Sequence, residues 1–197
     1  MTKRAIELNS NGFTTGQIAD ELNVSIDTAT WLLLGSQKEV SSPVPKDISV
    51  NWSSLGVRAS RLRFTAMALT DMIFEVPEAD DIDTVIGIAT SGIPVATMMA
   101  EEMDAEFAVY HGKKGRNNGS DSRKGFLSRN FSGDIKGKKC VIIDDVITTG
   151  TTINNVIDVL KQAGASPVAI GVLVDKQGFE ALSDVPVKSI MKIRRLD

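Results

Sequence analysis

Apolar residues in the first 35 positions recur at helical spacing and predict short helices. The segments with this pattern are residues 3–8, 15–22 and 25–34. Thr14 or Thr15 can cap the second of these helices and Ser25 the third, because a hydroxyl oxygen accepts hydrogen bonds from free backbone N–H groups. After Gly35, residues 36–47 contain two prolines and three serines without any periodicity. We therefore place a linker there.

After the linker, apolar runs alternate with helical patterns. Apolar residues at helical spacing predict helices over 58–74, 94–103 and 150–163. Continuous apolar runs predict strands over 84–89, 106–110, 140–144, 168–174 and 187–193. Strands that are apolar on both faces are typical of parallel sheets covered by helices on both sides. We predict such an α/β fold for residues 48–197, preceded by a small all-α domain over residues 1–35.

Between the second and third predicted strands lies a long segment, residues 111–139. It is rich in glycine and basic residues and nearly free of apolar periodicity. A loop of this length in a compact domain is usually functional or mobile. Its lysines Lys113 and Lys114 could neutralise a bound anion. The alternative is a solvated hairpin without a binding role.

Composition narrows the class of protein. A hydrophobic content of 42% and a charged content of 24% are those of a globular chain, and a net charge of −3 gives no basic footprint for nucleic acid. The single cysteine, Cys140, excludes an internal disulfide framework, and its apolar surroundings favour a small buried hydrophobe over a reactive thiol. There is no apolar stretch of membrane-spanning length and no apolar core of a signal peptide near the N-terminus. We therefore expect a cytoplasmic protein without a membrane partner.

The stretch CVIIDDVITTGTTINNVI, residues 140–157, joins two adjacent acids to a turn rich in threonine. Asp144 and Asp145 follow the apolar run of a predicted strand, and open parallel sheets bind ligands at the carboxyl ends of their strands. The turn offers backbone N–H groups at the start of a helix, a glycine for close approach and four hydroxyls. Its residues are Thr148, Thr149, Gly150, Thr151 and Thr152. A phosphate in the turn and a diol held by the acids would form a site for a phosphorylated sugar; the alternative is an acid pair followed by a helix cap.

The run V-I-I-D-D-V-I-T-T-G-T-T is similar to the signature of type I phosphoribosyltransferases, and the resemblance covers roughly residues 48–194. It implies the fold of that family. It also implies that Asp144 and Asp145 hold the ribose hydroxyls of phosphoribosyl pyrophosphate (PRPP) and that residues 148–152 bind its 5-phosphate. Mg²⁺ would be carried to the site by this ligand, with no direct metal site in the protein.

A second element, IGIATSGIPVA over residues 86–96, agrees with the first. It leaves a predicted strand and enters a predicted helix through Thr90, Ser91 and Gly92. In the family, the corresponding loop binds the pyrophosphate through backbone N–H groups, which require a small residue such as Gly92. Taken by itself, the segment is also an ordinary strand-to-helix turn.

Within the family the resemblance is strongest to orotate phosphoribosyltransferases, and the chain departs from them at two places. Their mobile loop has the form Lys-x-x-Lys-x-His-Gly, whereas here His111 and Gly112 precede the two lysines of the loop. An arginine that recognises orotate in those enzymes is replaced by Lys176, which is either a base-site residue or an ordinary exposed lysine. Both departures weaken an enzymatic role, because a misplacement of 1 Å can cost about a hundredfold in rate.

Residues 14–34 resemble a helix-turn-helix, whose second helix enters the major groove of DNA. The side chains that this helix would offer are Ser25, Asp27, Thr28 and Thr30. The helix contains no arginine or lysine, so its attraction for DNA phosphates would be weak. The alternative is a small helical domain for dimerisation or packing.

A helix-turn-helix joined to a phosphoribosyltransferase-like domain resembles the arrangement of the archaeal GfcR-type transcriptional regulators. This resemblance implies a homodimer that binds an operator and senses PRPP or a related phosphoribosyl metabolite. The two-fold symmetry of a dimer predicts an operator that is an inverted repeat. The alternative is an active phosphoribosyltransferase that transfers phosphoribose from PRPP to orotate or another base.

Overall fold

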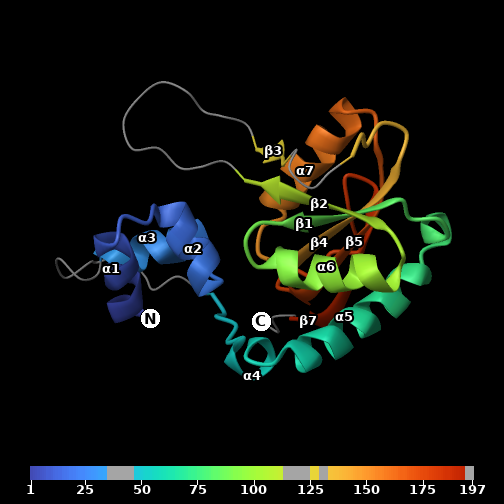
Figure 1. Ribbon diagram of the computed structural model, residues 1–197. Helices are drawn as coiled ribbons and strands as arrows, with labels where there is room; N and C mark the ends of the chain where they lie inside the picture. Colours follow the sequence, from blue (N-terminus) through green and yellow to red (C-terminus); the bar gives the residue numbers. More distant parts are fainter. Residues whose placement is uncertain (35–46, 113–124, 129–132, 194–197) are drawn as a thin grey trace. The chain divides into compact units, whose positions relative to one another are not determined.

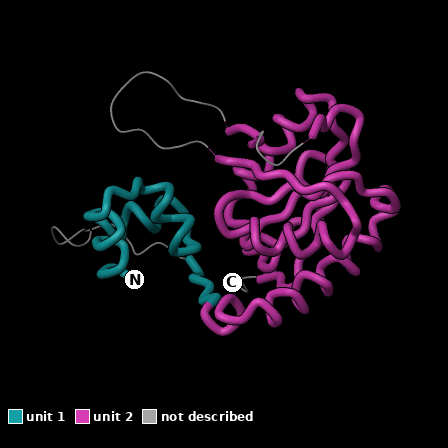
Figure 2. The backbone as a smooth tube through the Cα atoms, viewed as in Figure 1, with its two compact units in different colours: residues 1–52, 114–122 teal, residues 53–113, 123–197 magenta. Residues whose placement is uncertain are grey.

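The computed structural model describes residues 1–34, 47–112, 125–128 and 133–193, which form two compact units (Figure 2). Along the described chain, the first unit runs to Trp52 and the second begins at Ser53. The predicted linker over residues 36–47 lies outside the described residues, except for Asp47. Residues 48–52 belong to the first unit, although they were expected in the larger domain.

Three short helices make up most of the first unit: α1 (Thr2–Ser10), α2 (Thr15–Leu22) and α3 (Ile26–Leu34) (Figure 1). A capping box begins α2, in which the Thr14 hydroxyl accepts from the Gln17 N–H and the Gln17 side chain accepts from the Thr14 N–H. The helix ends at Asn23, which adopts a left-handed conformation with φ 53°. The three helices share a core of buried apolar residues: Ala5, Leu8, Ile18, Ala19, Leu22, Val24, Ala29 and Leu32.

In its described residues, the second unit is a seven-stranded sheet with helices on both faces (Figure 1). Its strands are β1 (Thr84–Ile88), β2 (Glu106–His111), β3 (Phe126–Leu127), β4 (Lys139–Ile147), β5 (Ser166–Asp175), β6 (Ala181–Leu182) and β7 (Val185–Lys192). Its helices are α4 (Ser53–Gly56), α5 (Ala59–Phe74), α6 (Gly92–Glu102) and α7 (Thr151–Gln162), with the 3-10 turn η1 (Pro77–Ala79). None of the helices in the described ranges combines the length and the apolar character needed to cross a membrane.

The sheet is mixed, whereas a wholly parallel one was predicted. The strand order is β3-β2-β1-β4-β5-β7-β6, in which the five central strands are parallel. The edge strands β3 and β6 are antiparallel to their neighbours. The difference arises because each edge strand has only two residues, which is too short for any hydrophobic pattern to show.

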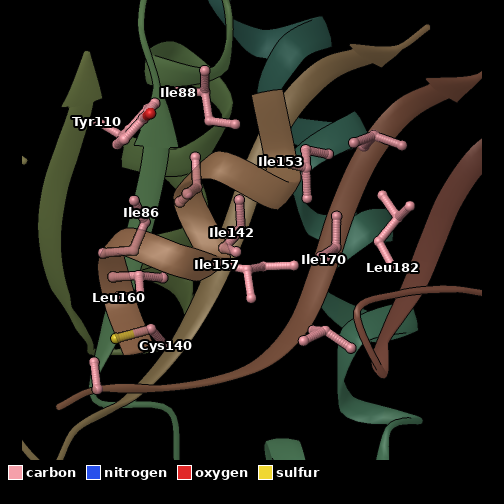
Figure 3. Close-up of a cluster of buried hydrophobic side chains, with 14 of the residues drawn as sticks. Ile86, Ile88, Tyr110, Cys140, Ile142, Ile153, Ile157, Leu160, Ile170 and Leu182 are labelled. Carbon is pink, nitrogen blue, oxygen red and sulfur yellow. The ribbon is translucent and has the colours of Figure 1, made fainter. Parts of the chain in front are cut away.

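The two faces of the sheet pack against different helices, because alternate residues of a strand point to opposite sides. Ile142, in the middle of β4, belongs to the apolar cluster that packs against α7 (Figure 3). On the other face, β1 and β5 carry glycines. A Cβ on Gly87 would lie 2.9 Å from Cβ of Ala96 in α6, and a Cβ on Gly171 would lie 3.2 Å from Leu69 in α5. Helices α5 and α6 therefore lie closer to the sheet than larger side chains would permit.

Strand β4 runs further than its apolar pattern predicted. The apolar run ends at Ile143, but the strand continues through both acids to Ile147, because it pairs with β5 over this whole length. Asp145 therefore lies inside the strand together with Asp144, whereas the predicted strand ended at Asp144.

Cys140 is fully buried in the cluster that faces α7 (Figure 3), as expected for a small hydrophobe. Burial first, and the nearby Asp83 carboxylate second, raise the pKa of its thiol to about 11. The thiol consequently stays protonated over the neutral range, whereas the thiolate is the reactive form.

We expect the Cys140 thiol to react with a disulfide reagent only after the chain unfolds. At pH 8 the native protein should show no fast labelling, and the protein in concentrated urea should label at its single cysteine. Because the folded-state pKa is raised above the unfolded value, the free energy of unfolding should decrease as pH rises from 9.0 toward about 11. Fast labelling of the native protein at pH 8 would contradict the buried position.

Candidate functional site

The chain changes direction across the sheet between β1 and β4. From β1 it passes to β2 on one side, and it later returns to β4 on the other side of β1. The helices that follow these two strands, α6 and α7, lie on opposite faces of the sheet (Figure 1). Open α/β sheets bind ligands at such a switch point, outside the carboxyl ends of the strands. Both sequence motifs lie at this place.

The two adjacent acids of β4 differ in their surroundings. Asp145 is 8% exposed, whereas Asp144 is half-buried. The Asp145 N–H donates a hydrogen bond to Oδ1 of Asp144 (2.9 Å), which orients that carboxylate against the strand. Adjacent side chains of a strand point to opposite sides, so the pair is not two equivalent groups on one surface. Asp144 is the acid with more surface open to a hydroxyl donor.

The turn from β4 to α7 depends on Gly150. This glycine directly precedes α7 and has φ +76°, a conformation that L side chains rarely adopt. A Cβ at this position would also lie 3.0 Å from Cδ2 of Leu182, so that the leucine side chain would have to shift. The threonines of the predicted phosphate turn surround the glycine. Thr148 is half-buried, and Thr149, Thr151 and Thr152 are exposed.

Hydrogen bonds order the first turn of α7. The Thr149 hydroxyl lies 3.0 Å from the Thr151 hydroxyl and accepts a long hydrogen bond from the Thr151 N–H (3.4 Å). The Asn154 N–H donates to the Gly150 carbonyl (3.0 Å), and the Asn154 side chain accepts from the Ser183 hydroxyl (2.8 Å). Hydroxyl groups and the positive end of a helix dipole thus occur together in one turn. This combination suits a phosphate.

The predicted pyrophosphate loop follows β1 and touches the acid motif. Thr90 and Ser91 are exposed, and Gly92 is buried at the start of α6. A Cβ on Gly92 would lie 2.6 Å from the carbonyl oxygen of Ile143 and 3.0 Å from Cα of Asp144. The structure therefore brings together two motifs that are far apart in the sequence, through direct contact of their backbones.

The end of β5, next to β4, carries the predicted base-site residue. The Lys176 N–H donates to the Ile147 carbonyl (3.0 Å), and the residue is half-buried rather than fully exposed. Asp175 is completely buried, and its Oδ1 accepts from the N–H groups of Gln177 and Gly178, both at 2.9 Å. This carboxylate shapes the turn that begins with Lys176.

The histidine of the predicted loop lies at the end of β2. His111 pairs with Phe126 of β3, and their rings stack with centroids 5.3 Å apart. The segment over 111–139 thus contains a short strand where a continuous loop was expected. The other loop candidates, Lys113 and Lys114, lie outside the described residues.

In the first unit, a residue from the end of the predicted linker holds the N-terminus of α3. Asp47 Oδ2 accepts hydrogen bonds from the Ser25 N–H (2.6 Å) and from the Thr28 hydroxyl (3.0 Å). The Ser25 hydroxyl accepts in turn from the Thr28 N–H (3.2 Å). Two residues further on, the Ser49 hydroxyl donates to the Leu22 carbonyl (3.4 Å). The segment that contains Asp47 therefore lies across the connection between α2 and α3.

This contact changes the picture of the residues predicted to face DNA. Thr28 is buried and Ser25 is half-buried, because Asp47 engages both. Thr28 is thus part of the cap of α3 and is not presented on its surface. Asp27 and Thr30 are exposed, and the Thr30 hydroxyl donates to the carbonyl one turn earlier (2.8 Å). These two keep the exposure that a groove contact requires.

Sequence reasoning missed Asp47 and Asp175, the two carboxylates that shape these sites. For Asp175 a signal existed, since an aspartate before a glycine-containing turn commonly bonds the backbone N–H groups two and three residues on. For Asp47 there was no local signal, because its partners Ser25 and Thr28 precede it by 22 and 19 residues.

A family model for the phosphoribosyl transferase domain matches residues 63–196. Over its full length the chain is 53% identical to "Transcriptional regulator GfcR 1" of Methanosarcina barkeri, and it covers 97% of that protein. This chain belongs to the GfcR family of transcriptional regulators. It is also 46% identical to "Transcriptional regulator GfcR" of Methanobrevibacter smithii, over the whole chain and 98% of that relative. The predicted regulator with a phosphoribosyltransferase-like domain is confirmed.

Solved structures confirm the fold that this GfcR family member shares with type I phosphoribosyltransferases. Adenine phosphoribosyltransferase from Rhodothermus marinus has a TM-score of 0.58 at 24% identity, over 77% of this chain and 90% of that one. Orotate phosphoribosyltransferase from Aeropyrum pernix has a TM-score of 0.56 at 26% identity, over 77% and 82%. A shared fold does not determine function, which depends on the chemistry of the individual residues at the site.

We expect Gly92→Ala to destabilise the second unit by about 1–3 kcal/mol, the usual cost of forcing a methyl group into packed space. The added Cβ would meet the Ile143 carbonyl at 2.6 Å, so that either α6 or β4 must shift. The free energy of unfolding in urea measures the effect. Gly56→Ala is the control, since a Cβ there meets nothing within 4 Å, and it should change stability by less than about 0.5 kcal/mol. Equal stability of the two variants would argue against the contact.

Proposed function

We propose that this protein is a cytoplasmic transcriptional regulator whose homodimer binds operator DNA through the first unit. The second unit senses PRPP or a related phosphoribosyl metabolite. Membership of the GfcR family supplies the regulatory role.

The contact between Gly92 and the β4 backbone at Asp144 is the observation that carries the ligand proposal. It unites three kinds of binding group at one switch point. The turn around Gly150 offers hydroxyls and a helix N-terminus to a phosphate, and the acids of β4 offer carboxylate oxygens to a diol. The loop before α6, with Ser91 and Gly92 as small residues, would offer backbone N–H groups to a pyrophosphate. PRPP contains these three groups in one molecule.

Mg²⁺ would enter this site together with PRPP. The cation prefers oxygen ligands and keeps several of them from water and phosphate groups. Pyrophosphate oxygens and ribose hydroxyls can supply most of these ligands, and the charges of Asp144 and Asp145 suit such a complex. The protein would then bind the metal through the ligand, without a separate site of its own.

The first unit supports the DNA proposal by its local geometry. Helices α2 and α3 are joined by residues 23–25, with a left-handed Asn23, and a helix-turn-helix joins its helices over such a short turn. Asp27 and Thr30 lie exposed on α3, which would serve as the recognition helix. Helix α3 has no arginine or lysine. Contacts to DNA phosphates would therefore come from residues outside this helix, such as Lys3 in α1.

An active phosphoribosyltransferase is the second candidate, and the match of residues 63–196 to the phosphoribosyl transferase domain favours it. Two residues oppose it. His111 precedes the loop lysines instead of following them, and Lys176 replaces a planar arginine with a point charge. An enzyme must place charge where it develops in the transition state, whereas a sensor needs only to bind the ground state.

We expect Asp144→Asn combined with Asp145→Asn to weaken PRPP binding by at least about a hundredfold. A hydrogen bond to a charged group contributes about 1.5–3 kcal/mol, and each 1.4 kcal/mol corresponds to a factor of about ten. Calorimetry with PRPP and Mg²⁺ measures the loss. Glu101→Gln combined with Asp158→Asn removes the same charge from exposed helical positions of the same unit and should leave the affinity unchanged.

The same preparations separate the sensor from the enzyme. With PRPP and either orotate or a purine base, the sensor should release almost no pyrophosphate. Turnover of about 1–10³ per second, the usual range of enzymes, would favour the phosphoribosyltransferase instead. Unchanged PRPP binding by the Asn double variant would exclude the proposed site under either function.

We expect PRPP to change the affinity for operator DNA by about 5- to 150-fold, the typical size of an allosteric coupling. Linkage requires reciprocity, so the same factor must appear when PRPP is titrated with and without DNA. The measurement is a titration of an operator fragment, selected from a random-sequence pool, at fixed salt because phosphate contacts are screened. The Asn double variant is the control and should show no PRPP effect. Identical DNA affinities with and without saturating PRPP would contradict the proposal that PRPP regulates DNA binding, although DNA binding itself would stand.

A further inference from the structure

The outer face of α5 carries large apolar side chains in contact with solvent. Phe64 is 71% exposed, Phe74 is 48% exposed and Met67 is 39% exposed. The opposite face of the same helix is buried against the sheet and α6 through Ala66, Leu69, Thr70 and Ile73. Scattered exposed hydrophobic residues are normal on protein surfaces, but a contiguous group on one helix marks an interaction site.

The spacing of these residues is that of a helix-pairing seam. Ser60, Phe64, Met67, Asp71 and Phe74 are all exposed and follow each other at intervals of four, three, four and three residues. This heptad spacing places them in one stripe along the helix, as in helices that pack side by side. A charged residue in such a stripe, here Asp71, can set the orientation of the partner. The face is therefore patterned for another helix.

The charges along α5 are complementary to those of a second α5 in the opposite direction. The N-terminal half of the helix carries Arg63, and the C-terminal half carries Asp71, both exposed. In a parallel pair like charges would meet, whereas in an antiparallel pair each arginine would lie near the aspartate of the other helix. A surface that is complementary to itself under a two-fold rotation is what a symmetric homodimer requires.

We propose that the occupant of this face is α5 of a second copy of the chain, packed antiparallel around a two-fold axis near Met67. The inference rests on the homodimer of the proposed function and assigns its surface to α5. It does not involve the ligand site, because the residues of the seam lie on the outer side of the helix, away from the sheet.

The first test is sedimentation equilibrium of the full chain and of Phe64→Glu. The wild-type chain should be a dimer. The variant should dissociate at least about a hundredfold more readily, because the two-fold axis places a buried charge on both sides of the interface. Phe126→Glu is the matched control, since Phe126 is 53% exposed on β3 in the same unit, and it should remain dimeric. Thermal unfolding followed by circular dichroism confirms that each variant is folded.

A second test uses the charges and leaves the apolar seam intact. Arg63→Glu and Asp71→Lys should each weaken the dimer by bringing like charges together. The double variant restores both pairs with reversed signs and should return the dissociation constant to within about tenfold of the wild-type value. A double variant weaker than either single variant would overturn the antiparallel arrangement.

The outcomes separate this proposal from the proposed function. A wild-type monomer would overturn the homodimer, and with it the assignment of its surface to α5. Protection of Phe64 from hydrogen exchange in such a monomer would show that another part of the same chain covers the face, and it would not rescue the assignment. A Phe64→Glu dimer as tight as the wild type would overturn only the assignment of the surface. PRPP binding, measured on the same samples, should be unaffected by Phe64→Glu, so that failure of the ligand site would be recognised independently.

Discussion

The close contact between Gly92 and the backbone of β4 is the constraint on which the candidate ligand site depends. With 2.6 Å between a Cβ at this position and the Ile143 carbonyl, only a hydrogen atom fits. The parallel pairing of Gly87 with Ile143 also fixes the position of β1, which leads into this loop, relative to β4. The strand pairing and the Gly92 contact both involve backbone atoms, so neither depends on side-chain rotamers. The loop before α6 and the acid at Asp144 therefore have a fixed separation before any ligand binds, and such preorganisation lowers the entropic cost of binding.

The opposite face of the sheet supports the other half of the site. Helix α7 buries its apolar side against the central strands through Ile153, Val156, Ile157 and Leu160. Its first turn is tied to the rest of the unit by the contact of Gly150 with Leu182 and by the hydrogen bond from Ser183 to Asn154. The threonines between β4 and α7 are thus polar residues on a short turn with both ends anchored in the core. Binding residues on short turns held by a rigid scaffold are common in α/β proteins.

The parts of this structure that the sequence predicted are those with a local signal. The central strands and the long helices follow apolar periodicity, and the cap at Thr14 and the turn at Gly150 follow the local requirements of their backbones. The missed parts depend on distant partners. Strand β4 extends to Ile147 because β5 pairs with it beyond the apolar run. Thr28 is buried because Asp47, 19 residues later, bonds its hydroxyl. The sequence around Ile147 and the sequence around Thr28 contain no pattern that indicates these distant partners.

Under the proposed function, the distribution of family features along the chain is what a sensor of a phosphoribosyl metabolite would retain. Ground-state binding of a phosphorylated sugar requires the glycines, hydroxyls and carboxylates around the switch point, and these match the family signature. Transition-state stabilisation requires in addition a charge aimed at the departing group and a planar contact that fixes the base. The chain departs from the enzymes at the two positions that would provide them, His111 and Lys176, while the packing that positions Asp144 is intact. If the second unit binds PRPP without turnover, as proposed, selection would constrain the scaffold and the turns that hold the ligand, and it would leave the catalytic loop free to change.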